Sequence, residues 1–384
     1  LIIDYGLETQ SAPDEFVPEN NSLSTFLHTG EQDSHTTFLL LDIASSSFNI
    51  FTFSKTVGRQ MTLPLIYYKC LDSLVPDYFE EINKPVMRNF IQDIYKGYRR
   101  DVTYHNDLHG SDLCQVLFVW LNSSKISEKL QFKEIDVFSL ITAAAVHDFK
   151  HPGTNNTYQV NFLTDIALSF NDSAVLENYH ISEAFKVLRN PKNDFMKEFL
   201  NAEEYKYVRK RIIDCVLATD MTGHAKVISA VKTKMDTNKV YEGNFIEKLL
   251  DDETNTKKTF EDQQDVLNLL THLADLAHNS KNSEISYKWS IMLYEEFFLQ
   301  GDIEKAAGIA PSFLCDRNTT NINKSQIGFI KFVILPSFEM LYNLIPETKS
   351  YLDNVSKNSL FWEKRAKEDE ELAKKKEEKP DQCK

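Results

Sequence analysis

The sequence predicts an all-α protein, and three observations support this fold class. Only 11 Gly and 11 Pro occur among the 384 residues, which favours long helices with few tight turns. Strand-like alternation of apolar and polar residues is nearly absent. Several segments instead repeat apolar residues at three- and four-residue steps, as amphipathic helices do. Because 42% of the residues are hydrophobic, including 26 Phe, the chain can bury a substantial core.

The elements follow in order along the chain. Residues 1–36 are polar and acidic and predict an N-terminal arm or linker. A helical pattern then runs from residue 37 to about residue 351. Its amphipathic segments include Val86–Tyr98, Leu113–Leu121, Val208–Leu217, Val266–Leu276 and Ile327–Ile334. The polar stretch Thr237–Gln264 predicts a surface loop between helices. Residues 352–384 include an almost wholly charged run, which predicts a solvated helix or a disordered tail; docking on a partner is the alternative.

Charge and cysteine content narrow the function classes. The net charge of −14 argues against nucleic-acid binding, which needs a basic face. An anionic substrate would then have to be received by metals or local dipoles. Five scattered cysteines without a CxxC pair favour a reducing, cytoplasmic location. No apolar run is expected to reach the roughly 20 residues of a membrane span. Because the chain begins at Leu1, the lack of a targeting segment says little, and tethering by missing segments stays open.

Metal-type side chains occur in three separate segments. His105 and His109 are four apart, so a helix would place them on one face, although two such histidines also fit an ordinary helix surface. His147 and Asp148 follow an apolar run, Leu140–Val146, that predicts a buried helix. A buried carboxylate needs a cation or a hydrogen-bonded partner, and a structural His–Asp hydrogen bond is the alternative. Mixed His and Asp ligands suit Zn, Mn, Fe or Mg.

Two further carboxylates lie near the ends of apolar segments. Asp275 stands in the run Leu273–Ala277, where it would again be buried. Asp220 follows Ala218 and Thr219 and could equally cap a helix. Three segments that each bury a metal-type side chain predict a metal site with open positions for water, which a hydrolase needs.

These motifs resemble the catalytic domain of the class I cyclic-nucleotide phosphodiesterases. That family carries seven short motifs in a fixed order, and their counterparts here are Tyr104–His109, His147–Gly153, Asn171–Asn178, Ala218–Met221, Ala274–Leu276, Glu295–Asp302 and Ser325–Phe329. The resemblance implies a single compact catalytic domain of about sixteen helices over residues 37–351. It also implies hydrolysis of 3′,5′-cyclic AMP, cyclic GMP or both to 5′-monophosphates, with a weak preference for cyclic AMP.

The resemblance implies roles for individual residues. The tightly bound metal, usually zinc, would be held by His109, His147, Asp148 and Asp275. Asp148 would also bridge to a second ion, magnesium or manganese, and the waters of these ions would be held by His151, Glu177 and Thr219. His105 would be the general acid, oriented by Glu296. The nucleotide would be bound by Tyr104, Leu293, Gln326 and Phe329.

Physical chemistry is consistent with these roles. A cyclic phosphodiester is an anion, and two metals can neutralise its oxygens and lower the pKa of a bridging water to give the hydroxide nucleophile. The leaving 3′-oxygen needs a proton, which an imidazolium supplies if a carboxylate keeps it charged. An aromatic face and an amide edge suffice to hold a purine.

Some features leave questions open. Many family members have proline at the position of Asn279, and the neighbouring His278 lies near the purine pocket, so the sequence does not decide the nucleotide preference. Another His–Asp metal phosphohydrolase would share the metals but would not use Gln326 with Phe329. A nucleotide-sensing pseudoenzyme or scaffold would have lost a ligand or the acid, and this chain has lost neither. A homodimer or a regulatory domain outside this chain remains open.

Overall fold

The computed structural model describes residues 40–238 and 256–377. In these ranges the chain has eighteen α-helices, several short 3₁₀ segments and one π-helix, and no strand. The predicted all-α class is therefore confirmed, with slightly more helices than the sixteen expected. The α-helices are α3 (Ile50–Val57), α4 (Arg59–Leu74), α5 (Pro76–Glu81), α6 (Lys84–Gly97), α7 (Asp107–Ser123), α8 (Ile126–Lys129), α9 (Glu134–Val146), α10 (Asn156–Asn161), α11 (Asp165–Phe170), α12 (Val175–Leu188), α13 (Met196–Phe199), α14 (Ala202–Leu217), α15 (His224–Asn238), α16 (Thr256–Asp275), α17 (Ser283–Ala306), α18 (Ile322–Phe329), α19 (Leu335–Leu344) and α20 (Lys349–Glu377).

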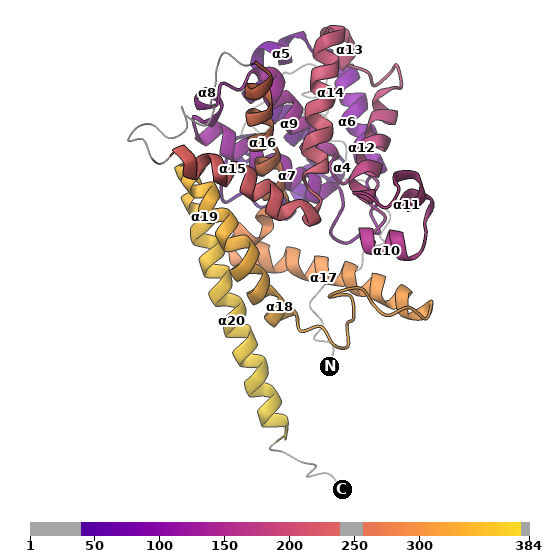
Figure 1. Ribbon diagram of the computed structural model, residues 1–384, viewed down its shortest axis with the longest axis vertical. Helices are drawn as coiled ribbons and strands as arrows, with labels where there is room; N and C mark the ends of the chain where they lie inside the picture. The colour runs from indigo at the N-terminus through magenta and orange to yellow at the C-terminus, as the bar shows by residue number, and fades with distance from the viewer. Residues whose placement is uncertain (1–39, 239–255, 378–384) are drawn as a thin grey trace.

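The centre of the molecule is formed by α7 and α9, which pack on α4, α14 and α16 (Figure 1). α9 is mainly apolar and is buried from Ile135 to Val146, a range that includes the run Leu140–Val146 predicted to be buried. α7 is buried from Asp107 to Leu121. The two helices therefore carry the residues at the end of α9 and the start of α7 into the interior.

Asn106 fixes where α7 begins. Its side-chain oxygen accepts a hydrogen bond from the Leu108 backbone at 3.0 Å, which satisfies a free N–H group of the first turn. Its amide nitrogen donates to the carbonyl oxygens of Val102 and Thr103 at 2.9 and 3.0 Å. These bonds fix the segment before α7 relative to its first turn. They therefore help to position His105, just before the helix, and His109, in its first turn.

The predicted surface loop over residues 237–264 is wrong at its C-terminal end. Residues 239–255 lie outside the described part of the chain, but α16 already begins at Thr256, and Gln263 and Gln264 are buried. Their side-chain oxygens accept hydrogen bonds from the fully buried Arg211 at 3.0 and 3.1 Å. A buried guanidinium needs polar partners, so a polar sequence here forms part of the interior.

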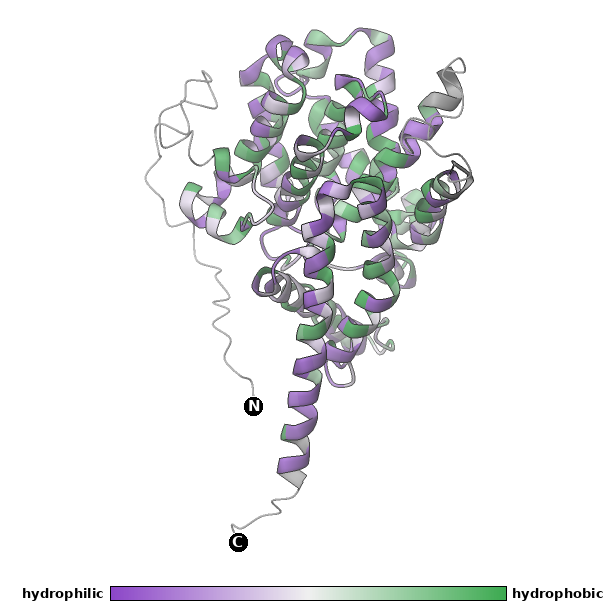
Figure 2. Cartoon of the chain, turned by 90° about the vertical axis from the view of Figure 1, so that its left-hand side faces the viewer, coloured by the Kyte–Doolittle hydropathy of each residue, from purple (hydrophilic) through white to green (hydrophobic). Residues whose placement is uncertain are grey.

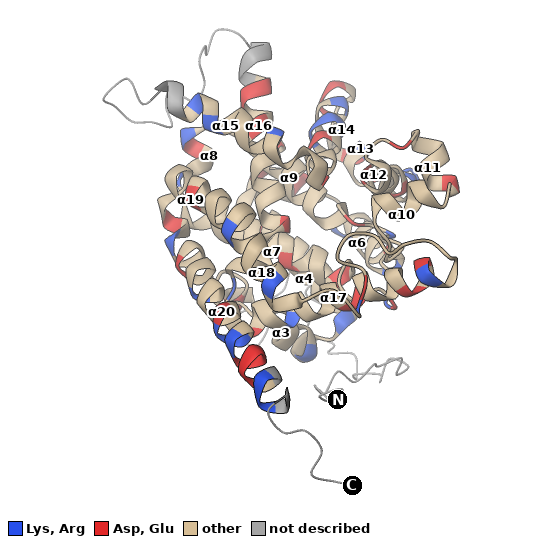
Figure 3. Ribbon diagram, turned by 60° about the horizontal axis from the view of Figure 1, so that its bottom comes forward, with Lys and Arg blue, Asp and Glu red and all other residues tan. Residues whose placement is uncertain are grey.

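A lower group of helices completes the fold. α17 and α18 lie beneath the upper helices, and α20 runs from the body past α18 towards the C-terminus (Figure 1). Figure 2 shows that the outer part of α20 is mainly hydrophilic, and Figure 3 shows Lys, Arg, Asp and Glu mixed along it. Its first half is nevertheless anchored by the buried side chains of Val355, Asn358 and Trp362.

Gly301 marks a close approach between α17 and the loop that follows it. A Cβ atom at this position would lie 1.8 Å from the carbonyl oxygen of Cys315. Only a residue without a side chain allows the two backbones to be this close. The contact holds the loop against the second half of α17.

One helical run in the described residues, Ile322–Leu344, is long and apolar enough to cross a membrane by length and composition. The expectation that no apolar segment approaches this length therefore does not hold here. Length and composition alone do not make this run a membrane span, because core helices of soluble proteins share both. The run is also not one regular helix: a π-helix, Ile330–Ile334, separates α18 from α19, and Pro336 follows in the first turn of α19.

The four cysteines in the described residues are free and buried: Cys70, Cys114, Cys215 and Cys315. Burial raises the pKa of each thiol, to about 11 for Cys215. They behave as small apolar core residues, which is how most free cysteines are used in protein interiors.

Candidate functional site

Four side chains from three helix ends meet in one buried cluster. His109 lies in the first turn of α7, His147 and Asp148 follow the last residue of α9, and Asp275 ends α16. One ligand-type atom from each of the four lies within 4.8 Å of the others, so together they could hold a metal ion. His109 Nε2 is 2.8 Å from Asp275 Oδ1, and His147 Nε2 is 3.0 Å from Asp148 Oδ2. The structure thus brings together all four residues that the sequence proposed as metal ligands.

The donor atoms of this cluster fit a cation. The ring nitrogen His147 Nδ1 donates to the Ala144 carbonyl oxygen at 2.9 Å, which orients Nε2 towards the cluster. His147 Nε2 and Asp148 Oδ2 are both buried and neither makes a hydrogen bond of good geometry. Unpaired buried donors and acceptors are rare in native proteins, and a bound ion is one common explanation.

The charges of the carboxylates agree with this interpretation. Burial raises the pKa of Asp148, but the nearby His147, His105 and His151 together outweigh this effect, so the pKa lies well below its ordinary range. Burial raises the pKa of Asp275, but the hydrogen bond with His109 and the nearby imidazole of His147 outweigh this effect and lower the pKa. Two ionised carboxylates in one buried site are stabilised by a divalent cation.

A second pair, His105 and Glu296, lies beside the cluster. His105 Nδ1 is 2.5 Å from Glu296 Oε1, while Glu296 Oε2 accepts hydrogen bonds from the backbone N–H groups of Tyr104 and His105 at 2.9 and 3.1 Å. Burial lowers the pKa of His105, but the charges of Glu296 and Asp148 raise it more, to about 9. Glu296 has a pKa of about 2, because His105 and these hydrogen bonds outweigh its burial. The pair is therefore an imidazolium held by a carboxylate.

The three residues expected to hold metal-bound water lie in different settings. His151 stacks on His105 with ring centres 4.2 Å apart, and its Nδ1 accepts from the Gly153 backbone at 3.0 Å. Burial raises the pKa of Glu177 to about 7, although Asn156 donates to both carboxylate oxygens. Thr219 donates its hydroxyl to a backbone carbonyl of α14 at 2.8 Å.

His180 is a site residue that the sequence analysis missed. Its Nδ1 donates to the Phe149 carbonyl oxygen at 2.8 Å, and its Nε2 lies 3.7 Å from Asp148 Oδ1. Asp148, His151 and His180 form a second set that could hold an ion. Asp148 therefore faces ligand-type nitrogens with both of its oxygens. The position of His180, three residues after Glu177 on α12, was the available signal, because this spacing places both on one helix face.

The residues expected to bind the base lie on α17 and α18. Leu293 and Phe329 are partly buried, and Gln326 is buried with no hydrogen-bond partner for its Oε1 atom. Tyr294, which the sequence analysis also missed, makes a side-chain hydrogen bond with Gln326 across the two helices. Tyr104 lies between the two parts of the site: its ring is 4.6 Å from that of His109, and its hydroxyl is 2.8 Å from His278 Nδ1.

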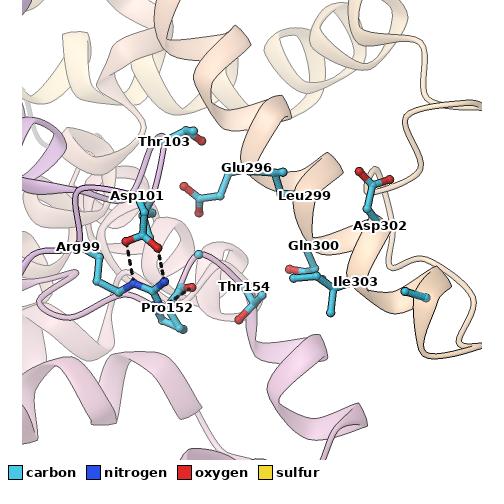
Figure 4. Close-up of a pocket in the computed structure, with 13 residues that line it drawn as sticks. Arg99, Asp101, Thr103, Pro152, Thr154, Glu296, Leu299, Gln300, Asp302 and Ile303 are labelled. Atoms are coloured by element: carbon cyan, nitrogen blue, oxygen red, sulfur yellow. Dashed lines mark hydrogen bonds and ion pairs between the residues drawn. The ribbon is translucent and has the colours of Figure 1, made fainter. Parts of the chain in front are cut away.

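A cavity of about 460 Å³ is lined in part by Glu296. Figure 4 shows the carboxylate of Glu296 among its lining residues and the Arg99–Asp101 ion pair across from it. The cavity adjoins the His105–Glu296 pair and is lined by none of the four metal-type residues, nor by Leu293, Gln326 or Phe329.

An all-α fold around buried His and Asp side chains defines a candidate metal-dependent hydrolytic centre. The family model for 3′5′-cyclic nucleotide phosphodiesterases matches residues 104–355, and this chain belongs to that family. The resemblance carried by the seven sequence motifs is thereby confirmed. The family is metal-dependent, and the His/Asp clusters of the described residues agree with that.

Curated relatives carry names from the same family. A Caenorhabditis elegans protein named "Probable 3′,5′-cyclic-AMP phosphodiesterase pde-4" is 34% identical over 76% of this chain. A Drosophila melanogaster protein named "3′,5′-cyclic-AMP phosphodiesterase, isoform F" is 36% identical over 72% of this chain. The matched region covers 42% and 40% of those two proteins, so this chain spans about two fifths of their length.

Proposed function

We propose that this chain hydrolyses 3′,5′-cyclic nucleotides to nucleoside 5′-monophosphates, with cyclic AMP as the preferred substrate. The observation that carries the proposal is the convergence of His109, His147, Asp148 and Asp275 beside the His105–Glu296 pair. One arrangement thus combines a cation site with a charged acid. The preference for cyclic AMP is supported by the names of the relatives.

In this proposal the four clustered residues would hold Zn²⁺, and Asp148 would also help to hold a second ion, Mg²⁺ or Mn²⁺. Bound there, the ions would neutralise the phosphate and lower the pKa of a coordinated water. His151, Glu177 and Thr219 would orient the surrounding waters. Support for the second position comes from Asp148 Oδ1, which lies 3.7 Å from His180 on the side opposite His147.

His105 would donate a proton to the leaving 3′-oxygen. Its Nδ1 is engaged by Glu296, which leaves the Nε2–H of the imidazolium as the proton to be transferred. Glu296 is fixed in turn by two backbone N–H groups, so the imidazole ring is held in one orientation before substrate binds. A positioned acid of this kind contributes typically 10²–10⁴-fold to a rate.

The base would be bound by Gln326 at its edge and by Phe329 and Leu293 on its faces, with Tyr104 at the boundary to the metal site. Gln326 suits this role because its buried Oε1 atom has no protein partner, which a base N–H group would supply. The second candidate function, a phosphohydrolase without base recognition, does not account for this unpaired Oε1 atom.

The catalytic unit would comprise residues 37–351, preceded by an arm and followed by the charged segment 352–384. We infer a reducing, cytoplasmic location from the buried free thiols. A homodimer or a regulatory domain outside this chain are further partners to be considered beside the cyclic nucleotide.

A steady-state assay with cyclic AMP and cyclic GMP, each with and without a chelator, tests the proposed function. We expect 5′-AMP as the main product, slower hydrolysis of cyclic GMP, and loss of both activities on chelation with recovery on adding Zn²⁺ and Mg²⁺. Activity that resists complete removal of metal would exclude this function, as would the absence of hydrolysis by the metal-loaded protein.

Substitutions in the base pocket should separate base recognition from chemistry. Phe329→Ala should raise KM because stacking on a base is worth about 1–3 kcal/mol. Gln326→Ala should impair hydrolysis of the cyclic nucleotides and leave that of bis(4-nitrophenyl) phosphate nearly unchanged, since that ester has no purine. Equal losses on both substrates would mean that Gln326 supports the metal site or the fold instead.

Glu296→Gln should move the alkaline limb of the pH–rate profile to lower pH. The wild-type carboxylate raises the pKa of His105, and His105 must be protonated to act as an acid. Removing the negative charge lowers that pKa, so the imidazolium is lost at lower pH and kcat at neutral pH falls about tenfold or more. Bound cations would themselves oppose protonation, which makes the carboxylate more important. The profile of kcat from pH 6 to 10 measures the effect, and an unmoved alkaline limb would contradict the assigned pair.

A further inference from the structure

α20 contacts three segments at or beside the base pocket: residues 279–281, α17 and α18. Asn358 donates to the carbonyl oxygens of Asn279 and Lys281 at 2.8 and 2.9 Å, beside His278. Trp362 packs on Tyr287 of α17, with ring centres 5.6 Å apart. A third contact is made further along, where the sequence is almost wholly charged and predicted only a solvated helix or a disordered tail.

In that third contact, the side chain of Asn323 on α18 donates a hydrogen bond to Asp369 Oδ2 at 2.6 Å. Asn323 is buried, with 7% of its surface exposed, so its amide depends on a protein partner. A charged acceptor makes this bond stronger than a bond between neutral groups. The neighbouring Lys324–Glu370 pair, at 3.3 Å, is exposed on both sides and contributes little.

Asn323 and Gln326 are three residues apart and therefore share a face of α18. The N-terminal turn of this helix is capped by Asn321, but the Oε1 end of Gln326 has no protein partner that would fix its position. Tyr294 on α17 bonds the Gln326 side chain, so the place of the amide in the pocket depends also on how α18 is held by its neighbours. On α20, which packs along α18, Asp369 contacts the first turn of α18 through the buried side chain of Asn323.

We propose that Asp369 is a positioning residue for the nucleotide base, acting through Asn323 and α18 on Gln326. The proposal rests on the proposed function, since it concerns the same site. It extends the functional unit into the charged segment beyond residue 351. A preorganised pocket binds its ligand without ordering a helix first, so loss of the contact affects substrate binding more than the chemical step.

The test compares Asp369→Ala with Glu368→Ala in the full chain. Glu368 is the adjacent carboxylate and pairs only loosely with Lys364, at 3.7 Å, so it is a matched control. We expect Asp369→Ala to raise KM for cyclic AMP about five- to tenfold, the scale of one lost charge-assisted hydrogen bond, with kcat within about twofold. Hydrolysis of bis(4-nitrophenyl) phosphate should not change, and Glu368→Ala should resemble the wild type. Unchanged KM in Asp369→Ala, or equal losses on both substrates, would overturn the proposal.

A swap of the two side chains tests whether the contact itself matters. Asn323→Asp alone sets two carboxylates against each other and should raise KM at least as much as Asp369→Ala. Asn323→Asp combined with Asp369→Asn restores an amide-to-carboxylate hydrogen bond and should recover most of the wild-type KM. A double variant whose KM is as high as that of either single variant would show that the contact is not the cause.

The proposed function and this inference can fail separately. If the wild-type chain hydrolyses neither cyclic nucleotide, the proposed function fails. If the wild-type chain is active and Asp369→Ala has the same KM, only this inference fails.

Discussion

His105→Ala should keep its metal ions and lose about a hundredfold or more in kcat on cyclic AMP. The imidazole is bound to Glu296 and is not one of the four clustered metal-type residues, so removing it should leave the cation site intact. What is lost is the proton that the leaving 3′-oxygen needs. Elemental analysis of the purified variant, together with its kcat, measures both parts of the expectation.

A substrate with a better leaving group provides the control for this variant. A nitrophenyl ester leaves without full protonation, so its hydrolysis should be affected less by His105→Ala than that of cyclic AMP. Metal content that falls in parallel with the rate would instead make His105 a ligand. If the rates on both substrates fall equally, His105 does not protonate the leaving group and acts in another step.

Asp148→Ala should remove both ions and lower activity by about a thousandfold or more, since metal ions contribute several kcal/mol to the transition state. Asp148 belongs both to the cluster of four and to the set with His151 and His180, with His147 near one oxygen and His180 near the other. Metal analysis after dialysis measures the loss. Asp353→Ala, which changes an exposed carboxylate on α20, should retain the full complement. If Asp148→Ala kept both metal ions, the proposal that Asp148 helps to hold both would be contradicted.

Much of the helical framework could be predicted because a buried helix face is recorded in the local sequence. α6, α7 and α14 show apolar residues at helical spacing, and α9 shows an uninterrupted apolar run. The start of α16 could not be predicted in this way. Gln263 and Gln264 are polar because they bind the buried Arg211 of α14, and the local sequence does not indicate a partner that lies so far along the chain.

The metal-type residues could be identified because each stands in an unusual local setting, such as a carboxylate at the end of an apolar helix. Neighbours that act through distant contacts were harder to identify, and for His180 the signal was only its spacing from Glu177. His180 reaches the site through the carbonyl of Phe149, 31 residues earlier, and α20 reaches it through Asn323, 46 residues before Asp369. Such contacts depend on how the helices pack together. The hydrophobic periodicity of one helix does not indicate which distant helix it will contact.

The buried cysteines have a consequence for how motion in this molecule can be followed. Cys70 lies in α4, Cys114 in α7, Cys215 in α14 and Cys315 beside Gly301, so each thiol belongs to a different part of the fold. Alkylating reagents attack the thiolate, and burial both shields these sulfurs and keeps them protonated. The rate at which each one is alkylated therefore reports how often its own helix or loop opens to solvent. The described residues thus carry four internal probes of local unfolding without any added label.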